Sequence, residues 1–178
     1  MLKRIENNLR EFVYGGMDGA VTTFAVVTGA AGANLSVRII LILGFANVLA
    51  DGFSMAVGSF LSEKSEQDLS VHKGESNRDD HESPIKASVA TFVSFLFVGF
   101  IPLSIYTIDF IFKLGLDAGD MLVYSVFLTL FAFALIGLLR ARITKITKSK
   151  AVIESLGLGL AAAIISFVVG NLLEKVIR

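Results

Sequence analysis

The sequence predicts an all-α integral membrane protein with five transmembrane helices. Hydrophobic residues make up 54% of the 178 residues and charged residues 18%, whereas soluble domains average about 45–50% and about 25%. A helix needs about 20 apolar residues to cross a hydrocarbon core of roughly 30 Å. Five segments have this length, so residues 1–178 are expected to form a single transmembrane domain.

The first two predicted helices span residues 12–33 and 38–61. Each is apolar apart from one aspartate, Asp18 in the first and Asp51 in the second. An ionisable side chain inside a span costs at least about 2.5–3.5 kcal/mol and usually faces a bundle interior or a watery path. Both aspartates are therefore expected to point inward and to carry a function.

The third predicted helix spans residues 85–112. Ser83 can cap its first turn, and Pro84 fits there because that position needs no N–H donor. Pro102 falls inside the helix and should kink it, since proline removes one backbone hydrogen bond. The last two predicted helices are apolar almost throughout and span residues 120–139 and 151–173.

The distribution of basic residues predicts the orientation. Five spans place the two termini on opposite sides of the membrane, and Lys and Arg accumulate on the cytoplasmic side. Twelve of the 16 basic residues lie in the N-terminal segment, in the connection after the second helix and in the connection after the fourth. The N-terminus is therefore expected in the cytoplasm and the C-terminus outside.

Charge balance and the lack of cysteine exclude several functions. The 16 basic residues cancel the 16 acidic ones, which leaves no positive surplus for binding nucleic acid. Without cysteine there are no disulfides, no catalytic thiolates and no zinc–thiolate or iron–sulfur sites. No span combines a nucleophile, a base and an oxyanion group, so we expect neither an enzyme nor a bound cofactor.

Polar residues of the first two helices point to a metal path. In the second helix Asn47, Asp51 and Met55 recur every four positions and share one face. This face is expected to meet the stripe that holds Asp18 in the first helix. Carboxylates combined with a thioether suit a divalent transition metal such as Fe²⁺. Alternatively, the aspartates join helices by hydrogen bonds and Met55 only packs.

Acidic residues also crowd residues 62–84, which are predicted to form a short cytoplasmic loop. Glu63 and Glu66 lie one helical turn apart and could present two carboxylates to one metal ion. A wider group could attract cations toward the path as a cytoplasmic funnel. Its members are Glu11, His72, Glu75, Asp79, Asp80, His81 and Glu82. The alternative is a solvated acidic loop without specific binding.

Three segments carry the motifs of a known family. Residues 18–25 read DGAVTTFA, similar to a family pattern of Asp-Gly followed by Pro/Thr-Phe-Ala. Residues 54–66 read SMAVGSFLSEKSE, close to Ser-Met-Gly-x-Gly-x-Tyr-Leu-x-x-Lys-Ser-Glu, and residues 83–87 read SPIKA. Together they resemble the vacuolar iron transporter family over nearly the whole chain.

The resemblance implies a homodimer of five-helix subunits in a lipid bilayer. Family members export Fe²⁺, and sometimes Mn²⁺, from the cytoplasm while protons move the opposite way. Asp18 matches the family's translocation aspartate, and Met55 matches its methionine in the second helix. The family often has glutamate where this chain has Asn47, and usually glycine at Asp51. We therefore expect Asp51 to replace the missing carboxylate.

The chain departs from the family in the connection after the second helix. This connection is too short for the large cytoplasmic metal-binding domain of some members, which is typical of a short prokaryotic-type member in a cell inner membrane. The alternative function is a membrane subunit that binds metal or assists assembly without transport. In that case the small residues of the last helix would serve as the assembly face.

Overall fold

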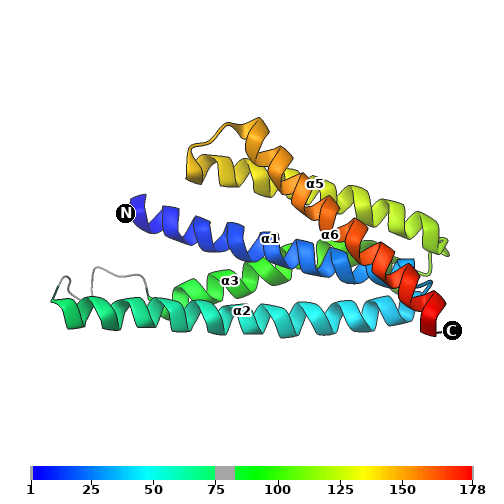
Figure 1. The fold of residues 1–178 in the computed structure, drawn as a ribbon, viewed down its shortest axis with the longest axis horizontal. Coiled ribbons are helices and arrows are strands. Elements are labelled where there is room, and N and C mark those ends of the chain that lie inside the picture. The colour runs from blue at the N-terminus through cyan, green and yellow to red at the C-terminus, as the bar shows by residue number, and fades with distance from the viewer. Residues whose placement is uncertain (1, 75–82, 178) are drawn as a thin grey trace.

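The computed structural model describes residues 2–74 and 83–177, with side chains from residue 9 onward. The described residues form only helices and their connections, which confirms the predicted all-α class (Figure 1). The helices are α1 (Leu2–Gly32), α2 (Val37–Lys73), α3 (Pro84–Gly99), α4 (Ile101–Phe112), α5 (Ala118–Thr144) and α6 (Lys148–Ile177).

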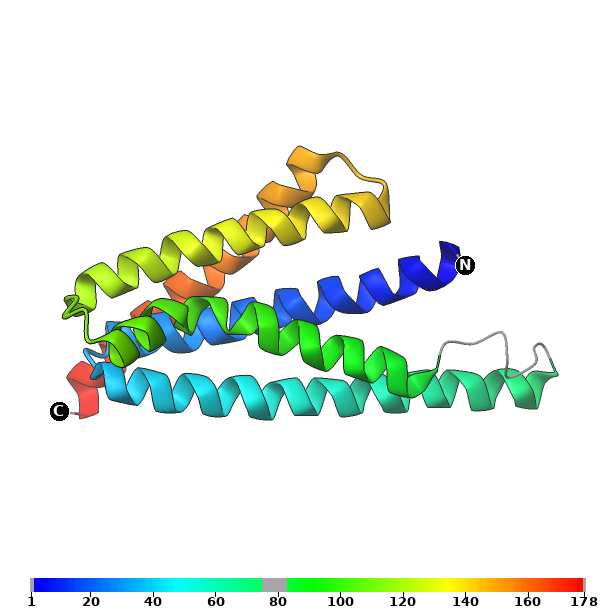
Figure 2. The same ribbon diagram turned by 180° about the vertical axis from the view of Figure 1, so that it is seen from behind.

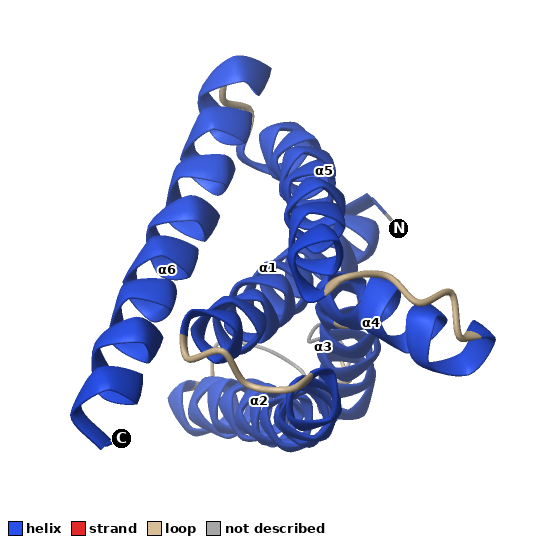
Figure 3. Ribbon diagram, turned by 90° about the vertical axis from the view of Figure 1, so that its right-hand side faces the viewer, coloured by secondary structure: helices blue, strands red, loops and turns tan. Residues whose placement is uncertain are grey.

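Helix α1 occupies the centre of the bundle and contacts all five other helices (Figure 3). Glycines permit this close packing, because small residues let helix backbones approach one another in lipid. A Cβ at Gly19 would collide with the backbone oxygen of Phe95 in α3. Further along α1, a Cβ at Gly32 would collide with the backbone oxygen of Phe167 in α6. The small residues of α1 thus serve two different neighbours, α3 and then α6.

The small residues of α6 pack against other helices of the same subunit. A Cβ at Gly159 would collide with the Phe133 ring, and one at Gly170 would collide with the backbone oxygen of Gly29. The Ser166 hydroxyl donates a hydrogen bond of 2.6 Å to the backbone oxygen of Ala25. Because α1 and α5 already cover this face, it is not a free assembly face.

The predicted third helix is broken into two parts. Helices α3 and α4 meet at Phe100 with a bend of 55°. Proline lacks an N–H and its ring clashes with the preceding turn, so Pro102 accounts for the break. The Leu103 N–H bonds to the Phe100 oxygen at 3.0 Å, a tighter spacing than the α-helical one. Ser83 takes the N-cap position of α3 without a side-chain cap bond, and Pro84 follows it.

Three helices in the described part of the chain are long and apolar enough to cross a membrane, namely α2, α5 and α6. The bent pair α3 and α4 makes a fourth if it counts as one span. Helix α1 is less apolar, because it contains several glycines and threonines together with Asp18. Its surface contacts other helices, so it needs fewer apolar side chains than a helix that faces lipid.

The helix ends fall into two groups at opposite ends of the bundle. Helix α1 begins at the end of the bundle where α2 ends, where α3 starts and where α5 connects to α6 (Figures 1 and 2). Helix α6 finishes at the opposite end. The predicted loop 62–84 is helical at first, because α2 continues to Lys73 and ends at Gly74 with a left-handed φ of 65°. Residues 75–82 lie outside the described part.

Candidate functional site

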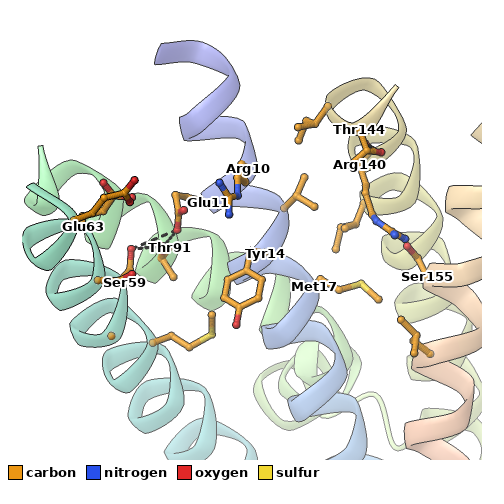
Figure 4. A pocket seen from close by; sticks show the side chains of 18 residues that line it. Arg10, Glu11, Tyr14, Met17, Ser59, Glu63, Thr91, Arg140, Thr144 and Ser155 are labelled. Carbon is orange, nitrogen blue, oxygen red and sulfur yellow. Dashed lines mark hydrogen bonds between the residues drawn. The ribbon is translucent and has the colours of Figure 1, made fainter. Parts of the chain in front are cut away.

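A cavity of about 710 Å³ lies toward the end of the bundle where α1 begins (Figure 4). Helices α1, α2, α3, α5 and α6 all contribute side chains to its lining. Its charged lining residues are Arg10, Glu11, Glu63, Glu66 and Arg140. Three carboxylates against two guanidinium groups give the cavity a modest negative excess, which favours cations.

Side chains of two neighbouring helices hold the Glu11 carboxylate. Its Oε2 accepts a hydrogen bond of 2.9 Å from the Thr91 hydroxyl in α3 and one of 3.4 Å from the Ser59 hydroxyl in α2. Figure 4 shows these three side chains meeting where α1, α2 and α3 approach. Hydroxyl donors to a carboxylate stabilise its charge and fix its direction. Glu11 is therefore a preoriented anionic group in the cavity wall.

An ion pair joins the other side of the cavity. Arg140 of α5 contacts the Glu154 carboxylate of α6 at 2.8 Å, with both side chains more than one-third exposed. Exposed pairs of this kind contribute about 0–1 kcal/mol. The pair therefore positions the Arg140 guanidinium at the cavity edge more than it stabilises the fold.

Asp18 and Asp51 lie deeper than the cavity lining. Both side chains are half-buried, and their carboxylates are close enough to interact electrostatically across α1 and α2. The Thr22 hydroxyl, one turn from Asp18, donates to the backbone oxygen of that residue instead of its carboxylate. Two carboxylates inside an apolar bundle repel each other, and a divalent cation between them would cancel both charges.

Met55 lies between the aspartate pair and the cavity. It lines the cavity and is half-buried, one helical turn from Asp51 in α2. Met17 of α1, the neighbour of Asp18, lines the same cavity. Figure 4 shows Met17 on the side of α1 that faces α5, where it packs against the apolar cluster of Phe133 and Ile136. Met55 is therefore the thioether that lies beside Asp51.

Six of the predicted site residues lie in or near the cavity, and the others lie apart from it or outside the described ranges. Glu11, Met55, Glu63 and Glu66 share the cavity, whereas Asp18 and Asp51 form the deeper pair. Asn47 is half-buried farther along α2, and His72 is exposed in its last turn. No group of three or more His, Asp or Glu side chains gathers into a metal site within the described ranges. The predicted funnel residues outside those ranges are Glu75, Asp79, Asp80, His81 and Glu82.

Several further side chains that line the cavity are not predicted by the sequence. They are polar or thioether side chains whose role depends on distant contacts, and the most relevant are Arg10, Tyr14, Met17, Ser59, Thr91 and Arg140. Thr91 and Ser59 meet Glu11 although 80 and 48 positions separate them from it. No local spacing could reveal such contacts. For Met17 the adjacent aspartate was a usable signal.

Comparison with known proteins gives a consistent family assignment. A model of the VIT family matches residues 9–79 and 69–171, which together include most of the chain. Among curated proteins, Vacuolar iron transporter homolog 4 of Arabidopsis thaliana is 35% identical over 101 residues, which cover 53% of this chain and 51% of that protein.

Two further relatives match different shares of the chain. Vacuolar iron transporter of Toxoplasma gondii is 44% identical over 61 residues, covering 34% of this chain and 20% of that protein. Membrane protein of ER body-like protein of Arabidopsis thaliana is 29% identical over 188 residues, covering 96% of this chain and 24% of that protein. The alignments thus span about half or less of the length of these relatives.

Proposed function

Because the chain belongs to the VIT family, we propose that it is a secondary transporter that exports Fe²⁺, and also Mn²⁺, from the cytoplasm in exchange for protons. The observation that carries this proposal is the position of Asp18 and Asp51, both half-buried on the neighbouring helices α1 and α2, beside a cavity lined by acidic groups. Relatives named vacuolar iron transporter support a metal substrate.

The proposed path begins in the cavity and ends beyond the aspartate pair. Glu63 and Glu66 attract the cation at the mouth, and Glu11 receives it in the wall. Met55 then offers its thioether about 6 Å before Asp51, since four residues separate them along α2. Oxygen ligands followed by a thioether suit Fe²⁺ better than Mg²⁺ or Ca²⁺.

Proton exchange follows from the chemistry of the paired carboxylates. While a divalent cation is bound, it compensates the charges of Asp18 and Asp51. When the cation leaves toward the outside, two uncompensated charges in a low-dielectric interior repel each other. Protons arriving from the outside can replace the metal, which couples export of the metal to import of protons. The same two groups thus serve both ions.

The proposed topology has five spans, with α1 as the first and the bent pair α3 and α4 as the third. Helix α1 has 31 residues, so at 1.5 Å per residue it exceeds the roughly 30 Å of a hydrocarbon core. The cavity end is cytoplasmic because the basic residues gather there. In a prokaryotic inner membrane the metal would leave the cell, and in a vacuolar membrane the lumen would replace the outside.

The subunit is proposed to act as a homodimer in the bilayer. Many large apolar side chains of α2, α5 and α6 are exposed on the single chain, for example Phe53, Phe127 and Ile165, each with about two-thirds of its surface exposed. Lipid and a second copy together would cover these faces. The competing function, a subunit that binds metal without moving it, loses support because the small-residue face of α6 is already occupied within the chain.

The test is uptake of Fe²⁺, with Mn²⁺ as comparison, into liposomes that contain the purified protein. Uptake should rise when the liposome interior is acidic. The Asp18→Asn variant should lose coupled uptake, whereas Asp117→Asn, an exposed aspartate before α5, should keep it. Metal binding without uptake by the unmodified protein would overturn the proposal and favour the non-transporting subunit.

A further inference from the structure

Three polar side chains of the bundle interior have a buried atom without a hydrogen-bond partner within the described part of the chain. The atoms are Thr23 Oγ1 in α1, Asn47 Nδ2 in α2 and the Tyr106 hydroxyl in α4. Thr23 is 0% exposed and Tyr106 1% exposed. A buried polar group without a partner costs about 1–3 kcal/mol. Three such groups in one small bundle therefore require an explanation.

Thr23 differs from the other threonines of its own helix. The hydroxyls of Thr22 and Thr28 donate to the backbone oxygens four residues earlier, at 2.9 and 2.8 Å. Buried Thr129 in α5 does the same at 2.7 Å. This local bond is open to any helical threonine through rotation about χ1. The Thr23 hydroxyl is thus directed away from its own backbone and into the bundle.

Thr23 and Asn47 lie at the same level of the bundle. Thr23 follows Asp18 by five residues, about 8 Å along α1 in the direction away from the cavity. Asn47 precedes Asp51 by four residues in α2, which runs antiparallel to α1 (Figure 1), so it lies about 6 Å from Asp51 in the same direction. Both positions are therefore on the outward side of the aspartate pair.

Tyr106 reaches this level from α4. It packs in one apolar cluster with Val27 of α1 and Val48 of α2, which are one turn from Thr23 and adjacent to Asn47. Helical side chains tilt toward the N-terminus of their helix, and α4 begins at the bend. The Tyr106 ring is thus inclined toward Leu103, one turn earlier in α4. Leu103 packs against Gly44 of α2, since a Cβ on Gly44 would collide with its side chain, and Gly44 is three residues from Asn47. The three groups come from three helices beside the bend.

We propose that Thr23, Asn47 and Tyr106 form a neutral hydration layer that receives the divalent cation, with its water shell, after it leaves the aspartate pair. This inference rests on the proposed transport function. Hydroxyl and amide groups bind the water shell of a hard or borderline cation through hydrogen bonds and offer oxygen ligands. They carry no charge and therefore hold the cation more weakly than Asp18 and Asp51. A weak layer on the outward side favours release.

The test removes the two hydroxyls with little change in side-chain volume. The double variant Thr23→Val with Tyr106→Phe should lower the maximal rate of Fe²⁺ uptake at least fivefold, with the KM changed less than twofold. Its melting temperature should stay the same or rise, because unpartnered buried hydroxyls are lost. The control Thr129→Val with Tyr124→Phe makes the same chemical changes outside the layer, and it should keep the rate.

Three other results would contradict the proposed hydration layer. An unchanged uptake rate would show that the hydroxyls take no part in transport. A lower melting temperature together with slower uptake would show that they stabilise the fold. The Thr23→Ser variant keeps a hydroxyl and should transport at the unmodified rate, whereas equal loss in Thr23→Ser and Thr23→Val would contradict a role for the hydroxyl. Absence of uptake by the unmodified protein would instead contradict the proposed function itself.

Discussion

The polar side chains on the two sides of Asp18 and Asp51 differ in charge and in hydrogen bonding. In the cavity half, Glu11 accepts hydrogen bonds from two other helices and Arg140 pairs with Glu154. In the outward half, the polar atoms named above for Thr23, Asn47 and Tyr106 are buried and have no hydrogen-bond partner among residues 2–74 and 83–177. The contrast therefore concerns particular groups: Glu11 and Arg140 at the cavity are charged and have side-chain partners, whereas Thr23, Asn47 and Tyr106 are neutral and lack them within the described part of the chain.

This difference favours movement of a cation in one direction, from the cavity past the aspartate pair. Charged groups that are already oriented by hydroxyl donors can take a cation from water without reorganising. Neutral groups without partners gain hydrogen bonds only when water or an ion arrives, and they hold it weakly. The gradient from three carboxylates in the cavity, through the aspartate pair, to a neutral layer therefore favours capture at one end and release at the other.

The largest expected effect comes from removing one charge of the aspartate pair that separates the two halves. Asp51→Asn should lower Fe²⁺ uptake into liposomes at least tenfold, because one charge of the pair is lost while the shape of the side chain is kept. Adding Asn47→Glu to that variant returns a carboxylate one turn farther out, where the family often has glutamate. The double variant should recover part of the uptake.

Two results would contradict this prediction. Full uptake by Asp51→Asn would show that Asp18 acts alone and that the pair is not needed. Failure of the double variant, with the protein still folded by its melting curve, would show that position 47 does not face the path. Asp117→Asn again serves as the control for a neutralised aspartate outside the path.

Much of the fold follows from local sequence. Long apolar segments, Pro84 at a helix start and Pro102 inside a helix are local signals. Pro84 and Pro102 have the expected structural consequences, whereas three or four of the five predicted spans are long and apolar enough within the described part of the chain. The extent of α2 was missed, since hydropathy marks the limits of lipid contact and not the limits of a helix. The central place of α1 was also missed, because its contacts with α3 and α6 depend on residues far apart in the chain.

The sequence likewise predicts some residues of the site and not others. An aspartate in an apolar segment stands out in the sequence, because a charged side chain in a membrane span costs free energy and is retained for a function. This signal predicts Asp18 and Asp51 as site residues. Thr91 gives no such signal, since a threonine in an apolar helix is common and its partner Glu11 lies 80 positions away. Unpartnered groups such as Thr23 are recognised only once all the neighbouring helices are placed.

A second prediction compares a satisfied hydroxyl with an unsatisfied one. Thr91→Val removes the 2.9 Å hydrogen bond to Glu11, and bonds to charged groups contribute about 1.5–3 kcal/mol. We expect the KM for Fe²⁺ to rise about threefold to tenfold and the melting temperature to fall. Thr23→Val should not lower the melting temperature, so the two variants should differ in the sign or size of that shift.

The control for Thr91 is Thr107→Val in α4, because the Thr107 hydroxyl donates to the backbone oxygen of Leu103 in its own helix, at 3.0 Å. It should leave the KM unchanged. If Thr91→Val and Thr107→Val behaved alike in both measurements, the orientation of Glu11 by Thr91 would have no role in capture. The cavity half would then differ from the outward half only in charge.

The smallest expected effect concerns the mouth of the cavity. Glu66 lines the cavity and is exposed, so its attraction for a cation acts through water and is screened by salt over about 10 Å at 0.1 M. Glu66→Gln should therefore raise the KM about twofold at low ionic strength and have almost no effect in high salt. Asp68→Asn, an exposed neighbour on α2 outside the cavity lining, should change the KM less at either salt concentration. A KM effect of Glu66→Gln that persists in high salt would mean that Glu66 ligates the metal directly, and capture would then begin at the mouth instead of at Glu11.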